Sequence, residues 1–239
     1  MESLEVELER ARDVSVPELA DAIESIGFEC TRCGACCKAE ASGGCGGSAD
    51  GSASEPHTAT VFPNEIRQLQ AAATERYDES YDWRDVARPM PYGIEETDDG
   101  RTGETFEWAL QTDGCGDCVF YTEADDGTGA CAVHDDRPLV CRTYPFSLAL
   151  GGATEPIGEA VDREGLVRAH ECEGLGRSIE REEADALAEA LKERTIRELE
   201  EAIGVRDNYR PRDDAGAVVH DSEGQKRPDG TALSDGPKR

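Results

Sequence analysis

Apolar residues recur at helical spacing in several stretches of the chain. Residues 15–18 read SVPE, a capping box, and the apolar positions from Leu19 to Ile26 predict a helix that ends at Gly27. Residues 63–77 predict a second helix, with Ile66, Leu69 and Ala73 on its inner face. Residues 179–203 predict the longest helix, stopped by Gly204, with an apolar stripe of Ala184, Leu187, Ala188, Leu191, Leu199 and Ile203.

Shorter apolar runs bounded by turn residues predict strands. Residues 94–111 predict a hairpin that turns at 97–104 and carries Phe106, Trp108 and Leu110 on one face. Residues 118–134 predict a second hairpin with DDGTG as its turn, which would bring Cys118 and Cys131 near each other. Residues 147–152 and 165–172 predict two further short strands, and residues 136–146 begin as a turn at a proline. The predicted fold is α+β: a small domain nucleated by cysteines or metal, with short hairpins, flanking helices and a long C-terminal helix.

The pattern also predicts a linear organisation. Residues 1–27 would be an N-terminal helical extension, and residues 28–175 the cysteine-cluster domain, with a flexible Gly/Ser loop at 41–56. Residues 176–206 would form the C-terminal helix. Residues 207–239 are polar and rich in Gly and Pro, so they predict a disordered acidic tail.

Charge changes this picture more than any other compositional feature. The chain has 53 Asp and Glu against 25 Lys and Arg, a formal net charge of −28. Such a charge destabilises a compact state unless salt screens it, which predicts a halophilic, haloarchaeal cytosol. An acidic mimic of DNA, or a protein that binds a basic partner, is the alternative interpretation. The sign of the charge argues against binding to nucleic acid.

No signal peptide and no membrane span are expected. Residues 1–13 lack an apolar core and a cleavage site, and no run of apolar residues is long enough to cross a bilayer. A cytoplasmic location follows as the expectation. Thiols stay reduced there, so the ten cysteines indicate metal or redox chemistry in place of a disulfide framework.

The spacing of the cysteines favours metal binding over buried thiols or redox disulfides. Residues 28–40 read FECTRCGACCKAE, and a C-x2-C turn directs two thiolates and backbone N–H groups toward one ion. The run C-x2-C-x2-C resembles the first three ligands of a bacterial ferredoxin cluster, but Cys37 stands where a ferredoxin continues differently. Adjacent side chains diverge, so Cys36 and Cys37 would serve two metals, or two edges of one polynuclear cluster.

Further cysteine motifs follow along the chain and point to a particular family. CTRCGACC is followed by CVFY, by CAVHDDRPLVCRTYPF and by a later cysteine. This combination resembles the YkgJ-type cysteine-cluster family, the CxxCxxCC zinc- or iron-chelating domain, over residues 28–175. The resemblance implies metal ligation by Cys30, Cys33, Cys36, Cys37, Cys118, Cys131, Cys141 and Cys172.

Several residues depart from that pattern or surround it. His134 replaces a tyrosine of the family and is a possible auxiliary ligand, although it more simply occupies the tyrosine site. Cys115 forms an extra C-x2-C with Cys118 and is another possible auxiliary ligand, whereas Cys45 is interpreted as a bystander thiol. Basic residues next to the ligand cysteines would stabilise an anionic metal site: Arg32, Lys38, Arg137 and Arg142. Arg137 and Arg142 are predicted to lie around the ligands and to contact them without binding the metal. The alternative for these two residues is an ion pair with a local acid.

The metal predicted by these residues is an iron–sulfur cluster, [4Fe–4S] by its spacing, or zinc. An Fe–S cluster would make the chain a redox protein and possible oxidoreductase with an unknown redox or protein partner. Zinc would make it a structural or binding module. Flagellin lysine methylases resemble the family distantly, so methyl transfer is a further alternative, and a metal-free thiol switch is another. Nucleotide-binding, hydrolase and zincin motifs are absent from the sequence, so no catalytic residue is predicted.

Overall fold

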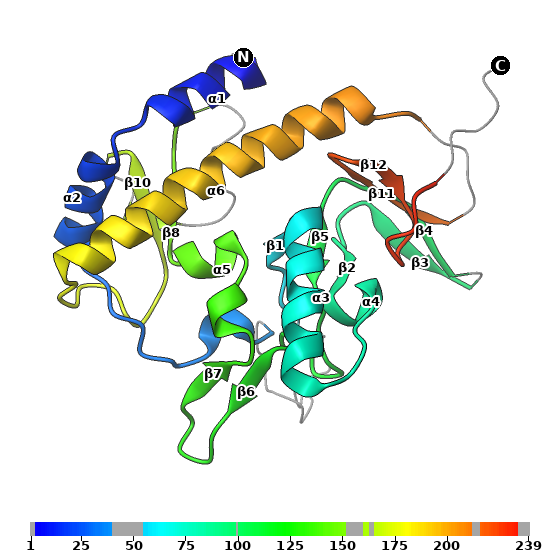
Figure 1. Ribbon diagram of the computed structural model, residues 1–239, viewed down its shortest axis with the longest axis horizontal. Coiled ribbons are helices and arrows are strands. Elements are labelled where there is room, and N and C mark those ends of the chain that lie inside the picture. Colours follow the sequence, from blue (N-terminus) through cyan, green and yellow to red (C-terminus); the bar gives the residue numbers. More distant parts are fainter. Residues whose placement is uncertain are drawn as a thin grey trace. The chain divides into compact units, whose positions relative to one another are not determined.

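The structure, a computed structural model, describes residues 3–39, 55–98, 100–151, 160–162, 165–211 and 216–233. It contains both helices and small sheets (Figure 1), which confirms the α+β prediction. Most of the loop predicted at 41–56, with Cys45, lies outside the described residues. Among the described residues, no helix is long and apolar enough to span a membrane.

The chain divides into two compact units, and each unit combines segments that are far apart in the sequence. The first unit comprises Met1–Cys36, Glu123–Ala130 and Arg137–Glu200. The second comprises Cys37–Thr122, Cys131–Asp136 and Glu201–Arg239. The boundary between them therefore falls inside the CxxCxxCC motif, between its two adjacent cysteines.

The first unit packs helices against a three-stranded antiparallel sheet of order β8-β10-β9. Its elements are α1 (Leu4–Asp13), α2 (Val16–Ile26), α5 (Leu139–Thr143), β8 (Phe146–Leu148), β9 (Ala160–Asp162), β10 (Val167–His170) and the larger part of α6 (Arg181–Asn208). The predicted start and end of α2 are confirmed: the Ser15 hydroxyl, one half of the predicted capping box, accepts a hydrogen bond from the Glu18 N–H at 3.4 Å, and Gly27 ends the helix with φ of 78°.

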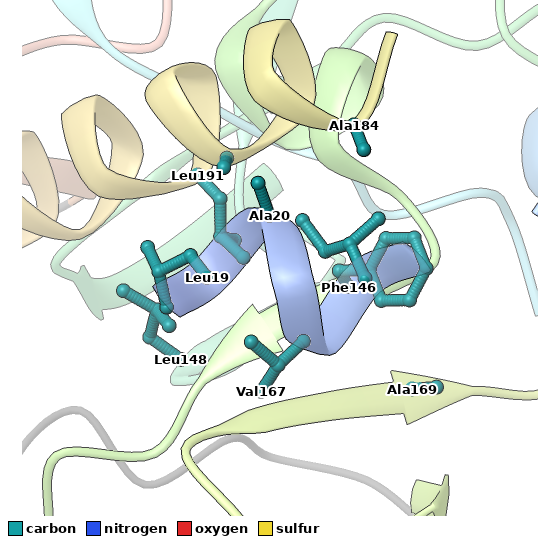
Figure 2. Close-up of a cluster of buried hydrophobic side chains, with 10 residues drawn as sticks. Leu19, Ala20, Phe146, Leu148, Val167, Ala169, Ala184 and Leu191 are labelled. Atoms are coloured by element: carbon teal, nitrogen blue, oxygen red, sulfur yellow. The ribbon is translucent and has the colours of Figure 1, made fainter. Parts of the chain in front are cut away.

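One apolar cluster holds the first unit together. Its buried members come from α2, β8, β10 and α6: Leu19, Ala20, Ile23, Phe146, Leu148, Val167, Ala169, Ala184, Ala188 and Leu191. In Figure 2 the side chains of α2 lie between those of α6 and those of the two strands. Within this unit, residues of the predicted N-terminal extension, the cysteine-cluster domain and the C-terminal helix pack together in one core.

The second unit is built from two sheets and helix α3. Its helices are α3 (Pro63–Tyr77), α4 (Trp83–Val86) and the 3-10 turn η3 (His134–Asp136). One sheet has the order β1-β5-β2 and the other β12-β11-β4-β3. The strands are β1 (Thr60–Val61), β2 (Ala87–Pro89), β3 (Ile94–Thr97), β4 (Gly100–Thr105), β5 (Trp108–Leu110), β11 (Ala217–Asp221) and β12 (Gly224–Lys226). The prediction for α3 is confirmed, with Ile66, Leu69 and Ala73 fully buried.

The predicted hairpin at 94–111 is wrong in its second half. β3 and β4 form the hairpin, but after Thr105 the chain leaves this sheet and Trp108 begins β5, the central strand of the other sheet. The change of sheet reverses the expected facing of one aromatic side chain. Trp108 and Leu110 are buried, whereas Phe106 is 48% exposed and packs beside Tyr209 and His220.

The predicted disordered tail is wrong for residues 216–233. β11 pairs in parallel with β4, with Ala217 opposite Gly103 and Val219 opposite Thr105, and its residues are buried. Gly204 also has a different role from the predicted stop, because α6 continues to Asn208. A Cβ atom at Gly204 would lie 2.5 Å from the Cβ of Ser222, so glycine here permits close packing on the segment after β11.

A buried ion pair fixes this C-terminal segment within the second unit. The Asp221 carboxylate is 1% exposed and accepts hydrogen bonds from Lys226 Nζ at 2.7 Å and from Trp108 Nε1 at 2.9 Å. The Lys226 ammonium also lies 5.2 Å from the centre of the Trp83 ring, a cation–π distance. The two charges lie only five residues apart, but the aromatic partners Trp108 and Trp83 come from segments distant in the sequence, so local composition could not reveal the burial of the pair.

Candidate metal centre

The first part of the cysteine motif is held by backbone pairing with the segment that carries Cys172. After α2, Phe28 forms an antiparallel bridge with Leu175. The Glu29 N–H donates to the Gly174 carbonyl at 3.1 Å, and the Gly176 N–H donates to the Gly27 carbonyl at 3.0 Å. Cys30 follows this pairing directly and Cys172 precedes it by two residues. The pairing therefore brings the first and last cysteines of the motif into the same region of the first unit.

Gly174 is required for this close approach. A Cβ atom at this position would lie 2.3 Å from the Glu29 carbonyl oxygen, well inside contact distance. We expect Gly174→Ala to push the two segments apart and to lower the free energy of unfolding by about 1–3 kcal/mol, as overpacking does. The matched control is Gly114→Ala, because a Cβ there meets nothing within 4 Å. Urea unfolding of both variants checks the prediction, and equal stabilities would contradict it.

Arg32 clamps the first C-x2-C turn onto the neighbouring hairpin. Its Nε donates to the Gly129 carbonyl at 3.0 Å, and its own carbonyl accepts from the Gly129 N–H at 2.7 Å. Its φ of 59° places it in the left-handed region, which non-glycine residues rarely adopt. The hairpin is β6 (Tyr121–Glu123) and β7 (Gly129–Cys131), which confirms the predicted DDGTG turn. The sequence places Arg32 beside the ligand cysteines, but this contact with a residue far along the chain is not visible in their spacing.

The adjacent pair Cys36 and Cys37 lies in a short 3-10 turn, η1 (Ala35–Cys37). With three residues per turn, successive side chains point about 120° apart. Hydrogen bonds hold Cys37 and the residues after it within the second unit. The Cys37 carbonyl accepts the Cys118 N–H at 2.8 Å, and the Ala39 N–H donates to Asp117 Oδ1 at 2.8 Å. The two neighbouring cysteines therefore belong to different units, Cys36 to the first and Cys37 to the second.

Cys118 and Cys131 lie on either side of the β6–β7 hairpin. The Tyr121 N–H donates to the Cys118 carbonyl at 2.9 Å, and the Ala132 N–H donates to the Phe120 carbonyl at 2.8 Å. The Cys118 side chain is buried, whereas Cys131 is half-buried at the end of β7. Both residues belong to the second unit, together with Cys37.

Cys141 lies in the middle of α5, a one-turn helix preceded by Pro138. The chain was predicted to turn at this proline, and the turn continues into the helix. The helix ends at Tyr144, whose N–H donates to the Val140 carbonyl and whose hydroxyl donates to the Glu171 carbonyl. Phe146, two residues further on, is buried in the core, whereas Tyr144 is only half-buried and reaches the residue before Cys172.

The electrostatics of the first unit show which thiols are neighbours. Burial raises the pKa of the Cys172 thiol. The Gly174 N–H, which lies 3.4 Å from the Cys172 sulfur, lowers this pKa. The nearby thiols of Cys33, Cys36 and Cys30 raise it further. Burial first, and then Cys172, Cys36, Glu171 and Cys33, raise the pKa of Tyr144 to about 12. Four cysteines and one phenol thus share a small region, where a bound cation would favour the thiolate form.

The predicted auxiliary ligands and basic residues have fewer defined contacts than the motif cysteines. His134 is 64% exposed and lies 3.3 Å from the Asp135 carboxylate, and both of its predicted roles, auxiliary ligand or occupant of the tyrosine site, stay predictions. Arg142 is exposed and Arg137 half-buried, and their role next to the metal stays a prediction. Cys115 is disulfide-bonded, so in this state it offers no thiolate, and its auxiliary role would require reduction.

The eight motif cysteines stand in the thiol form and divide between the units. The first unit holds Cys30, Cys33, Cys36, Cys141 and Cys172, and the second holds Cys37, Cys118 and Cys131. Among the described residues, no three Cys, His, Asp or Glu side chains converge closely enough to hold one metal ion. The backbone thus brings thiols into common regions, and a closed coordination sphere requires their side chains to turn inward.

An α+β chain whose separated segments gather the thiols of one motif is a cysteine-cluster protein. The chain belongs to the CxxCxxCC family, described as "Putative zinc- or iron-chelating domain", whose model matches residues 29–173. This description supports a metal-chelating role for the cysteines. No match to a curated protein or to a solved structure was found.

Proposed function

We propose that the chain is a redox protein that carries a [4Fe–4S] cluster on Cys30, Cys33, Cys36 and Cys172. The observation that carries the proposal is the position of Cys172 relative to the C-x2-C-x2-C run. The run supplies three ligands at the spacing found in bacterial ferredoxins, and their fourth ligand comes from a distant part of the chain. Here the backbone pairing of residues 27–29 with 174–176 supplies such a distant cysteine within the same unit.

The chain's own groups suit such a cluster. Four thiolates are the usual ligands of a [4Fe–4S] cluster, which when bound transfers one electron at a time. The Gly174 N–H already donates to the Cys172 sulfur, and hydrogen bonds to ligand sulfur tune the reduction potential. Arg32 fixes the turn between Cys30 and Cys33 through its contacts with Gly129.

Zinc is the second candidate, and the cysteines of the second unit favour it. Cys37 and Cys118 are joined by a backbone hydrogen bond, and Cys131 lies on the adjoining hairpin. Thiolates on short loops beside a small core are typical of structural zinc sites. In this alternative the chain is a zinc-stapled binding module. Methyl transfer, implied by the distant resemblance to flagellin lysine methylases, has no supporting observation among the described residues.

We place this redox protein in the cytoplasm, where it would exchange electrons with a redox partner. A reducing cytoplasm keeps the ligand thiols available, and the net charge of −28 suits a cytosol rich in salt. The partner would be a redox protein or a small redox molecule, and the acidic surface disfavours nucleic acid.

Anaerobic purification with metal and sulfide analysis tests the proposal. We expect a brown protein with broad visible absorption that bleaches on reduction, and about four iron and four sulfide per chain. A colourless protein with stoichiometric zinc and no sulfide would contradict the Fe–S proposal and support the zinc module. A chain that binds no metal after anaerobic reconstitution with iron and sulfide, or with zinc, would contradict both.

A further inference from the structure

We propose that Tyr144 is a positioning residue, whose hydroxyl holds Cys172 in place for metal binding through a hydrogen bond to the Glu171 carbonyl. The effect on a bound cluster rests on the proposed function, whereas the effect on the Cys172 segment does not. This tyrosine lies within the run CRTYPF, which carries part of the family resemblance, but the sequence alone predicted no positioning role for it.

Hydrogen bonds and burial hold the backbone on both sides of Tyr144. Its N–H closes α5 by donating to the Val140 carbonyl at 3.2 Å. On the other side, the Pro145 carbonyl accepts the His170 N–H at 2.9 Å, and Phe146 is 1% exposed in the core of the first unit. With its neighbours held in this way, the half-buried phenol extends to the peptide that precedes Cys172.

The hydroxyl contact completes a clamp around Cys172. Downstream, the Gly174 and Gly176 backbone pairs with residues 27–29. Upstream, the Glu171 carbonyl accepts the Tyr144 hydroxyl. Cys172 lies between these two attachments, so its Cα position is set from both sides. Because chelation favours ligands that are already in place, removal of the upstream attachment should weaken the contribution of Cys172 selectively.

If Tyr144 served only to pack its ring against apolar neighbours, loss of its hydroxyl would leave the Cys172 segment unchanged. Ring packing alone would be preserved in Tyr144→Phe, which keeps the aromatic body and removes only the hydroxyl. The hydroxyl also lies within the electrostatic reach of Cys172, Cys36 and Cys33, beside the thiols and not inside the apolar cluster. The phenylalanine variant therefore separates the two roles.

The first experiment uses the full-length chain after removal of metal by a chelator under reducing conditions. Alkylation by iodoacetamide is followed at individual cysteines by peptide mass spectrometry, with Cys131 of the second unit as the internal standard. We expect Tyr144→Phe to raise the alkylation rate at Cys172 by about two- to tenfold, the factor given by loss of one hydrogen bond, without change at Cys131. The matched control, Tyr92→Phe, removes the hydroxyl of a tyrosine that is 70% exposed and should change neither rate.

Two results would overturn the inference. One is an unchanged rate at Cys172, and the other is an equal increase at Cys172 and Cys131, which would indicate general loosening of the fold. If the wild-type chain carries a cluster, Tyr144→Phe should also shift its reduction potential and speed its loss to a chelator. A wild-type chain without iron would defeat the proposed cluster, yet the alkylation rates would still decide the role of Tyr144.

Discussion

Cys36→Ala is expected to abolish the proposed cluster, whereas Cys37→Ala, the substitution of its direct neighbour, is expected to retain it. Cys36 belongs to the first unit with Cys30, Cys33 and Cys172, whereas Cys37 belongs to the second and its carbonyl binds the Cys118 N–H. Alanine offers no replacement ligand, so we expect iron and sulfide in Cys36→Ala to fall below about a tenth of the wild-type content. Metal analysis and electron paramagnetic resonance after reduction provide the measurement.

The pair acts as its own control, because the two substitutions remove the same atoms from adjacent positions in one turn. Loss of the cluster from both variants would mean that the two cysteines serve one shared centre. Retention in both would remove Cys36 from the ligand set and contradict the proposed assignment. Zinc lost only from Cys37→Ala would locate a separate zinc site on the cysteines of the second unit.

Lys226→Met is expected to destabilise the chain by about 3–5 kcal/mol, the cost of leaving one buried charge without its partner. The Lys226 side chain is 8% exposed and the Asp221 side chain 1%, so water cannot replace the lost ammonium. Methionine keeps the length of the side chain, and the Asp221 carboxylate retains Trp108 Nε1 and the Glu223 N–H as donors. Urea unfolding gives the change in free energy.

An exposed ion pair supplies the control for this experiment. Arg101 pairs with Glu96 at 2.9 Å, and their side chains are 56% and 77% exposed. Arg101→Met should therefore cost less than about 1 kcal/mol. A loss of comparable size in Lys226→Met would show that the ion pair is not effectively buried. Adding Asp221→Asn to Lys226→Met should restore part of the stability, since it removes the stranded charge.

Local sequence patterns predicted what depends on neighbours along the chain. The helix at 63–77, the start and end of α2, and the DDGTG hairpin follow from capping, periodicity and turn residues. The tail prediction was wrong because β11 is a short apolar run within polar sequence. Its burial depends on β4 and on Trp108, more than a hundred residues upstream, and periodicity does not detect such contacts.

In the candidate site, too, the sequence predicted the local features but not the contacts between distant segments. The resemblance supplied the cysteines, but the spacing could not assign them to units. That assignment depends on pairings such as Glu29 with Gly174 and Cys37 with Cys118. The tyrosine of the CRTYPF run and the Cys-x-Gly step at Cys172 were visible in the sequence, but no role in placing the ligands was predicted for either.

The parallel pairing of β11 with β4 has a consequence for biosynthesis. Residues 103–105 leave the ribosome long before residues 217–219, so the edge of β4 has no partner while most of the chain is being made. The core of the first unit likewise waits for Ala184, Ala188 and Leu191 of α6. Cys172 is the last of the four proposed cluster ligands to be synthesised, so a cluster on these cysteines could be completed only after residue 172, and the earlier thiols would need protection from oxidation until then.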